Sequence, residues 1–153
     1  MISAPEVLDL PPQKVARIAI ACPSSEIMKV MGPGIQELHA VLGAQGVTPT
    51  GPWFTHHLKM PGESFDFAIC LPVDAEIKPD GRVTNGVLPG GRTARTVYTG
   101  GYEGLGNAWG QFIAWMNDQN LNPAPTLWEV YTKGPETGPD LTQYQTQLNR
   151  PLL

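Results

Sequence analysis

Residues 88–109 read LPGGRTARTVYTGGYEGLGNAW, and this stretch decides how the rest of the chain is interpreted. Residues 92–99 read as a strand, which Gly100-Gly101 interrupts. A helix is expected from about Tyr102 to Gln119, because apolar residues recur there at helical spacing. The apolar stripe consists of Leu105, Trp109, Phe112, Ile113 and Met116. The stretch therefore predicts a strand, a glycine break and an amphipathic helix.

The flanking sequence predicts the same order of elements twice. After the helix, strands are expected at 126–133 (TLWEVYTK) and 144–152. In the first half we expect a strand at 14–22, a helix at 33–45 ended by Gly46, a strand at 53–58, a turn at Pro61-Gly62 and a strand at 65–71. Alternation in the last of these places four side chains on one face: Phe65, Phe67, Ile69 and Leu71. Both halves thus read β-α-β-β, with residues 1–10 as a lead-in.

The letters of the two halves also match. Residues 15–17 (VAR) correspond to 93–95 (TAR), an offset of 94 − 16 = 78. Residues 53–56 (WFTH) correspond to 128–131 (WEVY), an offset of 128 − 53 = 75. We therefore predict one α+β domain over residues 1–153, with duplicated β-α-β-β units at about 11–75 and 82–152 that form one antiparallel sheet.

Composition and charge narrow the function classes. The net charge is −4 and no basic run is present, so direct nucleic-acid binding is not expected. No apolar run approaches the roughly 20 residues that cross a bilayer, and the N-terminal segment has no basic leader, so a cytoplasmic location is expected. Cys22 and Cys70 lack metal spacing, and adjacent strand residues such as His56 and His57 cannot chelate one metal. We expect no metal and no cofactor.

The stretch at 88–109 resembles the signature of the GyrI-like domain. The matching parts are Leu88-Pro89, Gly91, Ala94, Gly100 and Tyr102-Glu103-x-Leu105. Further similar segments are Gly51-Pro52, Asp66 to Val73, Trp128 to Tyr131, Thr146 to Leu148 and Pro151-Leu152. The resemblance implies a pseudo-twofold pair of β-α-β-β units, with one antiparallel sheet, two main helices and a central ligand cleft. The family includes effector domains of multidrug-responsive regulators, an inhibitor of DNA gyrase, and stand-alone proteins that resemble hydrolases of cyclopropane-bearing compounds.

Glu129 is the most informative single residue. Alternation along its strand places Leu127, Glu129 and Tyr131 on one face. A carboxylate in such an apolar element is costly to bury without a partner, and the resemblance places the equivalent Glu inside the ligand cleft. A desolvated carboxylate attracts poorly hydrated organic cations, or acts as a general base if its pKa rises. The alternative is a solvated Glu129 paired with a surface lysine.

The other candidate ligand-binding residues follow from the duplication and from the helix stripe. The offset of 75 makes Phe54 and His56 the counterparts of Glu129 and Tyr131, so these two pairs are expected to line opposite sides of one cleft. Further candidates are Phe67, Ile69, Tyr98, Trp109 and Phe112.

Three functions remain open from the sequence. The first is stand-alone binding of small hydrophobic, planar or cationic organic compounds in a cleft centred on Glu129. The second is a hydrolase in which Glu129 activates water and Tyr131 stabilises the developing charge. The third is a protein–protein inhibitor, such as of DNA gyrase, which would require a protein partner.

Overall fold

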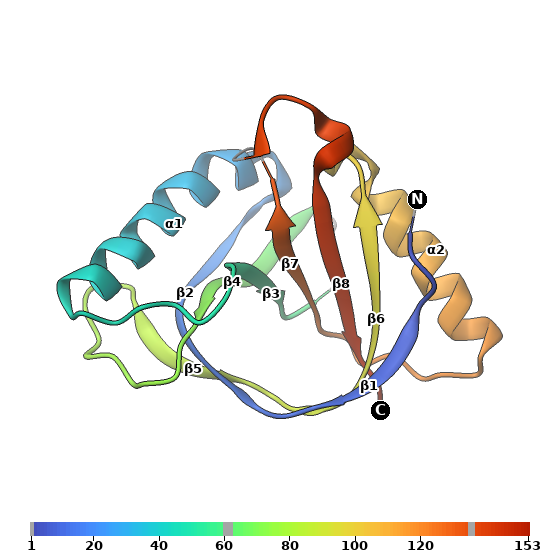
Figure 1. Cartoon of the computed structure of the whole chain (residues 1–153), viewed down its shortest axis with the longest axis horizontal. Helices are drawn as coiled ribbons and strands as arrows, with labels where there is room; N and C mark the ends of the chain where they lie inside the picture. The colour runs from blue at the N-terminus through green and yellow to red at the C-terminus, as the bar shows by residue number, and fades with distance from the viewer. Residues whose placement is uncertain (1, 60–62, 135–136) are drawn as a thin grey trace.

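The computed structural model describes residues 2–59, 63–134 and 137–153, with the side chain of Met28 also left out (Figure 1). It is an α+β fold with one curled antiparallel sheet of eight strands and two main helices. The strands are β1 (Glu6–Leu10), β2 (Gln13–Pro23), β3 (Phe54–His57), β4 (Ser64–Pro72), β5 (Thr84–Leu88), β6 (Gly91–Thr99), β7 (Leu127–Lys133) and β8 (Gln145–Pro151). The helices are α1 (Ile27–Ala44) and α2 (Leu105–Asp118), with short 3₁₀ turns η1 (Ser24–Glu26), η2 (Tyr102–Gly104) and η4 (Leu141–Gln143). The turn expected at Pro61-Gly62 lies outside the described residues.

The sheet order shows the duplication directly. The strands lie in the order β1-β6-β8-β7-β3-β4-β2-β5, so β7 and β3 meet at the centre and the two halves mirror each other. The duplicated β-α-β-β units predicted from the sequence are β2-α1-β3-β4 and β6-α2-β7-β8.

The lead-in expected at residues 1–10 is wrong, because it contains strand β1, and no strand was predicted at β5. Residues 6–10 form an edge strand that pairs with β6, and β5 pairs with β2 in the corresponding way. Each half thus contributes its first strand to the outer edge of the other half. Both strands are only five residues long and contain Asp, Asn or Gly, which weakens the local strand signal.

Helix α1 begins at Ile27, six residues before the predicted start at Pro33. Pro33 lies inside the helix, although an interior proline removes one backbone hydrogen bond. Gly34 packs so closely on the sheet that a Cβ atom there would lie 2.6 Å from Cδ1 of Ile69. Tertiary packing of the helix on the sheet therefore outweighs the local proline signal.

Both helices end in the same way. Gly46 (φ 68°) follows α1, and its repeat counterpart Asn120 (φ 59°) follows α2, an offset of 120 − 46 = 74. The Val47 N–H donates to the Leu42 carbonyl at 3.0 Å, and the Leu121 N–H donates to the Met116 carbonyl at 2.9 Å. These are Schellman motifs, and the stop predicted at Gly46 is confirmed.

Each helix covers one half of the same sheet face (Figure 1). The cluster under α1 contains Phe67, Ile69 and Leu71 from β4, which confirms the predicted alternation. The apolar stripe of α2 packs on β6, β7 and β8, also as predicted. No helix in the described part of the chain is both long and apolar enough to cross a bilayer.

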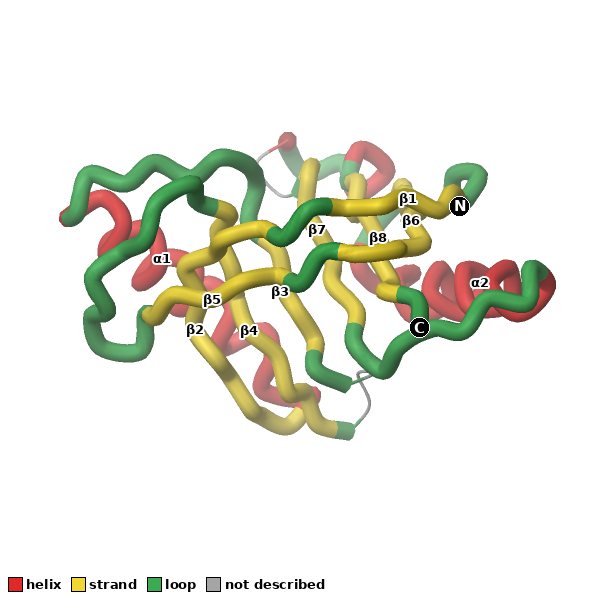
Figure 2. Tube along the Cα trace, turned by 90° about the horizontal axis from the view of Figure 1, so that it is seen from below, coloured by secondary structure: helices red, strands yellow, loops and turns green. Residues whose placement is uncertain are grey.

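The other face of the sheet holds a smaller core where the linker from β1 to β2 and the linker from β5 to β6 pass each other. Figure 2 shows the β1–β2 and β5–β6 linkers side by side near the middle of the molecule. Gly90 is required at this crossing, because a Cβ atom there would lie 2.5 Å from the Leu10 carbonyl oxygen. Trp128, Phe54 and Leu88 are buried beneath the linkers. We call this side the linker face and the other side the helix face.

Candidate functional site

Glu129 lies on the helix face of β7, at the centre of the sheet, and is only 7% exposed. Leu127 belongs to the α2 core while Trp128 belongs to the linker-face core, so the predicted alternation of β7 is confirmed. The Trp109 indole Nε1–H donates to Oε2 of Glu129 at 2.7 Å. The Tyr131 hydroxyl donates to Oε1 at 2.8 Å. Helix α2 and strand β7 therefore hold the carboxylate from two sides.

A chain of hydrogen bonds continues from Tyr131 into the first half of the molecule. The Thr55 hydroxyl lies 2.8 Å from the Tyr131 hydroxyl and 3.1 Å from Nε2 of His57. Because Tyr131 donates its one proton to Glu129, Thr55 must donate to Tyr131 and accept from His57. We therefore assign the imidazole proton to Nε2. Every donor in the chain then points toward the carboxylate, which suits an ionised Glu129.

The three titratable side chains of this cluster, Glu129, His57 and Tyr131, all have shifted pKa values. Burial raises the pKa of Glu129, and the hydrogen bonds from Trp109 and Tyr131 act in the opposite direction. Burial, followed by the neighbouring His56, lowers the pKa of His57 to about 4. Burial, followed by the charge of Glu129, raises the pKa of Tyr131 well above 10.0.

No cation of the described chain neutralises that carboxylate. His57 Nε2 lies 3.9 Å from Oε1 of Glu129, but its imidazole is neutral near pH 7. Among residues 2–59, 63–134 and 137–153, no Lys or Arg forms an ion pair with Glu129. A buried anion without a cationic partner is energetically unfavourable, and a positively charged ligand would relieve that cost.

Further aromatic rings pack against Tyr131 and His57, two members of the hydrogen-bonded chain. Trp53 stacks on Tyr131 with 4.3 Å between ring centroids, and Tyr102 meets Tyr131 edge-on at 5.9 Å. Phe67 stacks on His57 at 5.3 Å. Trp53, Tyr102 and Tyr131 are half-buried, whereas Glu129 itself is buried.

The predicted pairing of Glu129 and Tyr131 with Phe54 and His56 is wrong. Strand β3 places Thr55 opposite Glu129, so Phe54 and His56 point to the linker face. The true repeat offset here is 129 − 55 = 74 rather than 75, and a shift of one residue moves every side chain of a strand to the other face.

Hydrogen bonds at the start of the two strands establish this offset. The Thr50 N–H donates to the Pro72 carbonyl at 2.9 Å, and the Ala124 N–H donates to the Pro151 carbonyl at 2.8 Å. Thr50 and Ala124 are again 124 − 50 = 74 residues apart. The repeat counterparts of Glu129 and Tyr131 are therefore Thr55 and His57, which complete the hydrogen-bonded chain.

The remaining candidates divide into those that reach the carboxylate and those that do not. Trp109 contacts Glu129 directly, and Phe67 reaches it through His57. Phe112 and Ile69 are fully buried in the α2 and α1 cores. Tyr98 is buried and donates to the Gly101 carbonyl at 2.7 Å.

Four residues of the cluster were not predicted from the sequence: Trp53, Thr55, His57 and Tyr102. An offset of 74, which the helix ends at Gly46 and Asn120 also follow, would have indicated Thr55 and His57. Trp53 precedes β3, and Tyr102 precedes α2. Outside a regular strand or helix, sequence spacing does not predict where a side chain points.

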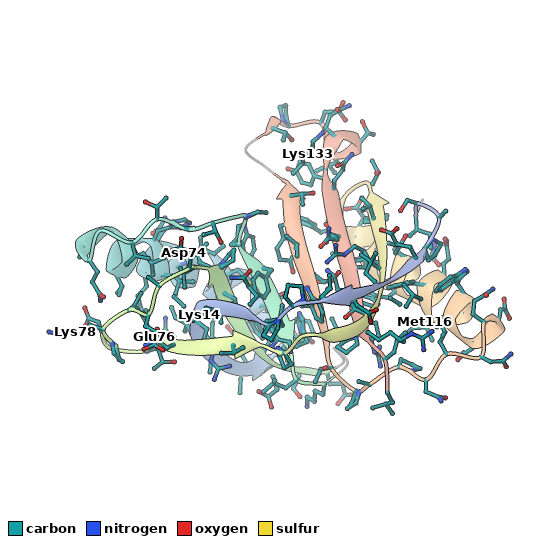
Figure 3. The ribbon with its side chains drawn as sticks, turned by 60° about the horizontal axis from the view of Figure 1, so that its bottom comes forward. Lys14, Asp74, Glu76, Lys78, Met116 and Lys133 are labelled. Carbon is teal, nitrogen blue, oxygen red and sulfur yellow. The ribbon has the colours of Figure 1, made fainter. Side chains whose placement is uncertain are left out.

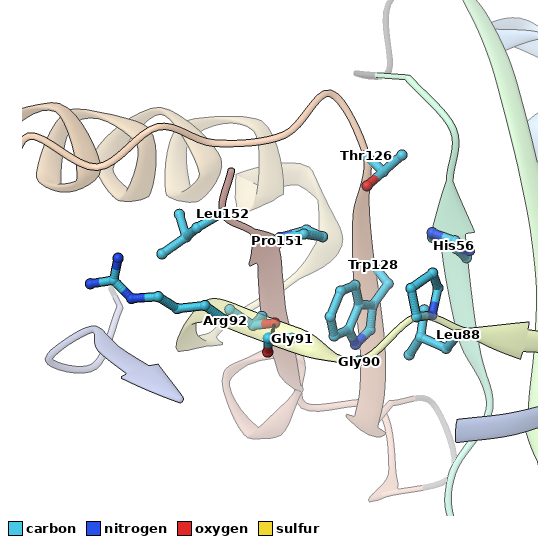
Figure 4. Close-up of a pocket in the computed structure, with 11 residues that line it drawn as sticks. His56, Leu88, Gly90, Gly91, Arg92, Thr126, Trp128, Pro151 and Leu152 are labelled. Carbon is cyan, nitrogen blue, oxygen red and sulfur yellow. Dashed lines mark hydrogen bonds between the residues drawn. The ribbon is translucent and has the colours of Figure 1, made fainter. Parts of the chain in front are cut away.

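Two of the cavities formed by the described residues lie away from Glu129, and neither is lined by it. One of about 170 Å³ lies on the linker face, and His56 and Trp128 are among its lining residues (Figure 4). The other, of about 180 Å³, lies beside β5, near the surface charges of Lys14 and Glu76 (Figure 3).

Thr146 on β8 offers a stability test beside this cluster. It is fully buried next to Tyr131, and within the described residues its hydroxyl has no hydrogen-bond partner. Thr146→Val removes an unsatisfied polar atom while conserving shape, so the free energy of unfolding should rise by about 1–3 kcal/mol. Urea denaturation of both proteins measures this difference. Unchanged or lower stability would mean that the hydroxyl has a partner in solution.

Comparison with known proteins shows the same architecture. A family model described as GyrI-like small molecule binding domain matches residues 3–149. The crystal structure of the EcmrR C-terminal domain is similar with a TM-score of 0.86 and 22% identity, covering 98% of this chain and 97% of that one. In an EcmrR–DNA complex the match has a TM-score of 0.85 and 24% identity, and covers 97% of this chain but only 57% of the EcmrR chain.

A more distant similarity is to SAV2435, whose structure was determined bound to tetraphenylphosphonium. The TM-score is 0.61 at 9% identity, with 99% of this chain and 94% of that chain covered. A comparison with curated protein sequences finds no significant match.

Proposed function

Because this chain belongs to the GyrI-like family of small-molecule-binding domains, we propose that it binds a hydrophobic organic cation at Glu129, between the aromatic rings that surround the carboxylate. The observation that carries this proposal is a buried carboxylate with hydrogen-bond donors but no Lys or Arg partner among the described residues.

Electrostatics favour a delocalised cation over an inorganic one. Two unit charges about 4 Å apart attract by about 4 kcal/mol at the effective dielectric constant of about 20 that suits protein sites. The gain counts only after the cation has lost its water, and that loss costs less when the charge is spread over a large organic framework. The Glu129 carboxylate therefore favours organic cations that are weakly hydrated over inorganic cations.

The aromatic surroundings support selection for flat, apolar groups. Trp53, Tyr102, Trp109 and Tyr131 come from four different segments around the carboxylate. A cation over the face of such a ring gains about 0.5–2 kcal/mol, and apolar rings of the ligand gain further from burial.

Ligand entry requires the covering rings to move. Trp53 and Tyr102 lie outside the regular strands and helices, Trp53 in the loop before β3 and Tyr102 in the 3₁₀ turn before α2. Their half-buried rings can rotate at lower cost than the fully buried Phe112. We therefore propose that the cation enters between α1 and α2, past Trp53 and Tyr102.

Calorimetry with two matched probes tests the proposed function. Tetraphenylphosphonium carries a delocalised positive charge, whereas triphenylphosphine oxide presents similar phenyl rings without net charge. We expect the cation to bind at least about tenfold more tightly, which corresponds to about 1.4 kcal/mol. Binding of tetraphenylphosphonium should also change the fluorescence of Trp109 and Trp53. Equal affinity for the two probes, or none for either, would contradict the proposal.

The affinity for tetraphenylphosphonium should depend on pH. Burial raises the pKa of Glu129 above its ordinary value of 4.5. Below the raised pKa a cation must displace a proton, so affinity should fall by up to about tenfold per pH unit, and it should be constant above. His57, with its pKa lowered to about 4, and Tyr131, with its pKa well above 10.0, do not titrate near neutral pH. Calorimetry over a pH series measures the curve, and tighter binding at lower pH would rule out a carboxylate as the cation's partner.

Hydrolysis is a second candidate function, favoured by the raised pKa of Glu129 and its hydrogen bond to Tyr131. Glu129 would take a proton from water as the water attacks a strained ring, and Tyr131 would donate to the oxygen or carbon that gains charge. Both carboxylate oxygens already accept hydrogen bonds from the protein, which stabilises the charged form and weakens the base. Loss of a cyclopropane-bearing electrophile with wild type but not with Glu129→Gln would establish this role, and equal loss with both would exclude it.

A further inference from the structure

Several residues that line the cavity on the linker face have repeat counterparts in the first half of the molecule. Leu88 of β5 pairs with Gln13, and Leu10 of β1 pairs with Gly91 in the same way, at an offset of 91 − 13 = 78. Gly91 is therefore the repeat counterpart of Gln13.

Backbone hydrogen bonds extend this correspondence. The Val73 N–H donates to the Lys14 carbonyl at 3.0 Å, and the Leu152 N–H donates to the Arg92 carbonyl at 2.9 Å. Lys14 and Val73 in the first half thus correspond to Arg92 and Leu152 in the second.

In the first half, the side chain of Gln13 lies against the carbonyl groups of Lys14 and Val73. Its carboxamide Nε2 donates to the Lys14 carbonyl at 2.8 Å and to the Val73 carbonyl at 3.1 Å. The carboxamide therefore satisfies acceptors at the ends of two neighbouring strands.

In the second half, the corresponding side chain is missing. Gly91 has φ +133°, and a Cβ atom built on it would meet no atom within 4 Å. Gly91, Arg92 and Leu152 instead line the cavity of about 170 Å³. Within the described residues, the Leu152 carbonyl has no counterpart of the hydrogen bond that Gln13 donates to Val73.

The remaining walls are mainly apolar and uncharged. Leu88, Trp128 and Pro151 supply apolar surface, and Figure 4 shows the Arg92 side chain pointing away from Trp128. His56 lies at one side of the cavity, and its pKa is lowered by burial and then by Arg17, so its imidazole is neutral near pH 7. A neutral ligand suits these walls better than an ion.

We propose that this cavity, named here the Gly91 cavity, binds a small neutral molecule that carries a carboxamide on an apolar stem. The carboxamide N–H₂ takes the place of the Gln13 side chain and donates to the Leu152 carbonyl, while the stem lies against Trp128. The volume is below the range of about 300–1,000 Å³ of sites for drug-sized ligands, so the ligand is a fragment such as an aromatic amide.

This site is independent of the one at Glu129. Trp128 and Glu129 are neighbours on β7 and point to opposite faces of the sheet. The Trp109 indole N–H is bonded to Glu129, whereas the Trp128 indole belongs to the Gly91 cavity. The two indoles therefore report separately on the two sites.

Nuclear magnetic resonance titration of the whole chain tests the proposal. The probes are benzamide and methyl benzoate, which share the ring and carbonyl but differ in the N–H₂ donor. We expect benzamide to shift the Trp128 indole signal with saturation, and methyl benzoate to bind at least about tenfold more weakly, the equivalent of one hydrogen bond. Equal affinities, or shifts at Trp109 without shifts at Trp128, would overturn the proposal.

A pair of matched variants locates the binding. Thr126 lines the cavity, and exposed Pro52 is its repeat counterpart at an offset of 126 − 52 = 74. Thr126→Phe should fill the Gly91 cavity and reduce benzamide affinity at least about tenfold, while Pro52→Phe should leave it unchanged. Unchanged binding in a folded Thr126→Phe would contradict the proposal. If that variant does not fold, the preference for benzamide over methyl benzoate at Trp128 in the wild-type chain decides.

Discussion

Glu129→Gln is expected to weaken the binding of tetraphenylphosphonium by about 10- to 100-fold, a loss of about 1.4–2.7 kcal/mol. The substitution keeps the size and planarity of the side chain and removes its charge. The amide oxygen can still accept from Trp109 or from Tyr131, so the cluster should retain much of its geometry. The expected loss is therefore the charge attraction between ligand and carboxylate. Calorimetry of both proteins in one buffer measures it, since salt screens such attractions.

Glu37→Gln provides the matched control. Glu37 lies on α1, pairs with Arg82 at the surface at 3.2 Å, and its loss changes the net charge by the same amount. Its effect on tetraphenylphosphonium affinity should be less than about twofold, because exposed charges are screened.

Stability separates a charge effect from misfolding. A group whose pKa is raised by folding stabilises the native state below its unfolded-state pKa and loses that contribution as pH rises through the folded-state value. Above the folded-state pKa of Glu129, the Glu129→Gln substitution therefore removes an unfavourable buried charge, and the variant should unfold there at the same temperature as wild type or higher. An unchanged affinity in such a well-folded variant would rule out Glu129 as the cation's partner.

Phe112→Ala is expected to lower the free energy of unfolding by about 3–5 kcal/mol. Phe112 is fully buried beneath α2, where it packs on Trp109 and Trp115 with centroid distances of 5.7 and 6.3 Å. Removing the ring leaves a cavity that the sheet and helix cannot close. For a chain of this size the unfolding temperature should fall by roughly 6–20 °C, measurable by calorimetry or circular dichroism.

Two control variants help to interpret the effect of Phe112→Ala on stability. Phe112→Leu keeps most of the apolar volume and should cost less than half as much as the alanine substitution, whereas Gln111→Ala at an exposed neighbour should be nearly neutral. Phe112→Leu should also retain its affinity for tetraphenylphosphonium, because Phe112 is fully buried in the α2 core. A normal unfolding temperature with lost affinity would instead make Phe112 a direct ligand contact.

The candidate site was predictable in part. Mid-strand Glu129 with Tyr131 two residues later, and Trp109 on the helix stripe, are recognisable from alternation and helical spacing, and these residues do meet in the structure. Phe54 and His56 were assigned to the wrong face because the repeat alignment of one short strand was off by one residue. In a strand, unlike a helix, an error of one residue reverses the direction of the side chain.

The order and type of the main elements and the faces of β4, β7 and α2 could be predicted from the residues alone, because each of these depends on spacing within one segment. The duplication could be predicted as well, because the two halves share matching letters. The pairing of β1 and β5 could not be predicted in this way, since each strand joins the half to which it does not belong in sequence. The tertiary structure also decided that Thr55 and His57 complete the chain to Glu129, because cross-strand register brings together residues more than 70 positions apart. Local patterns specify which way side chains point within one helix or strand. Contacts between elements depend on strand register and packing, which the pattern of a single segment does not specify.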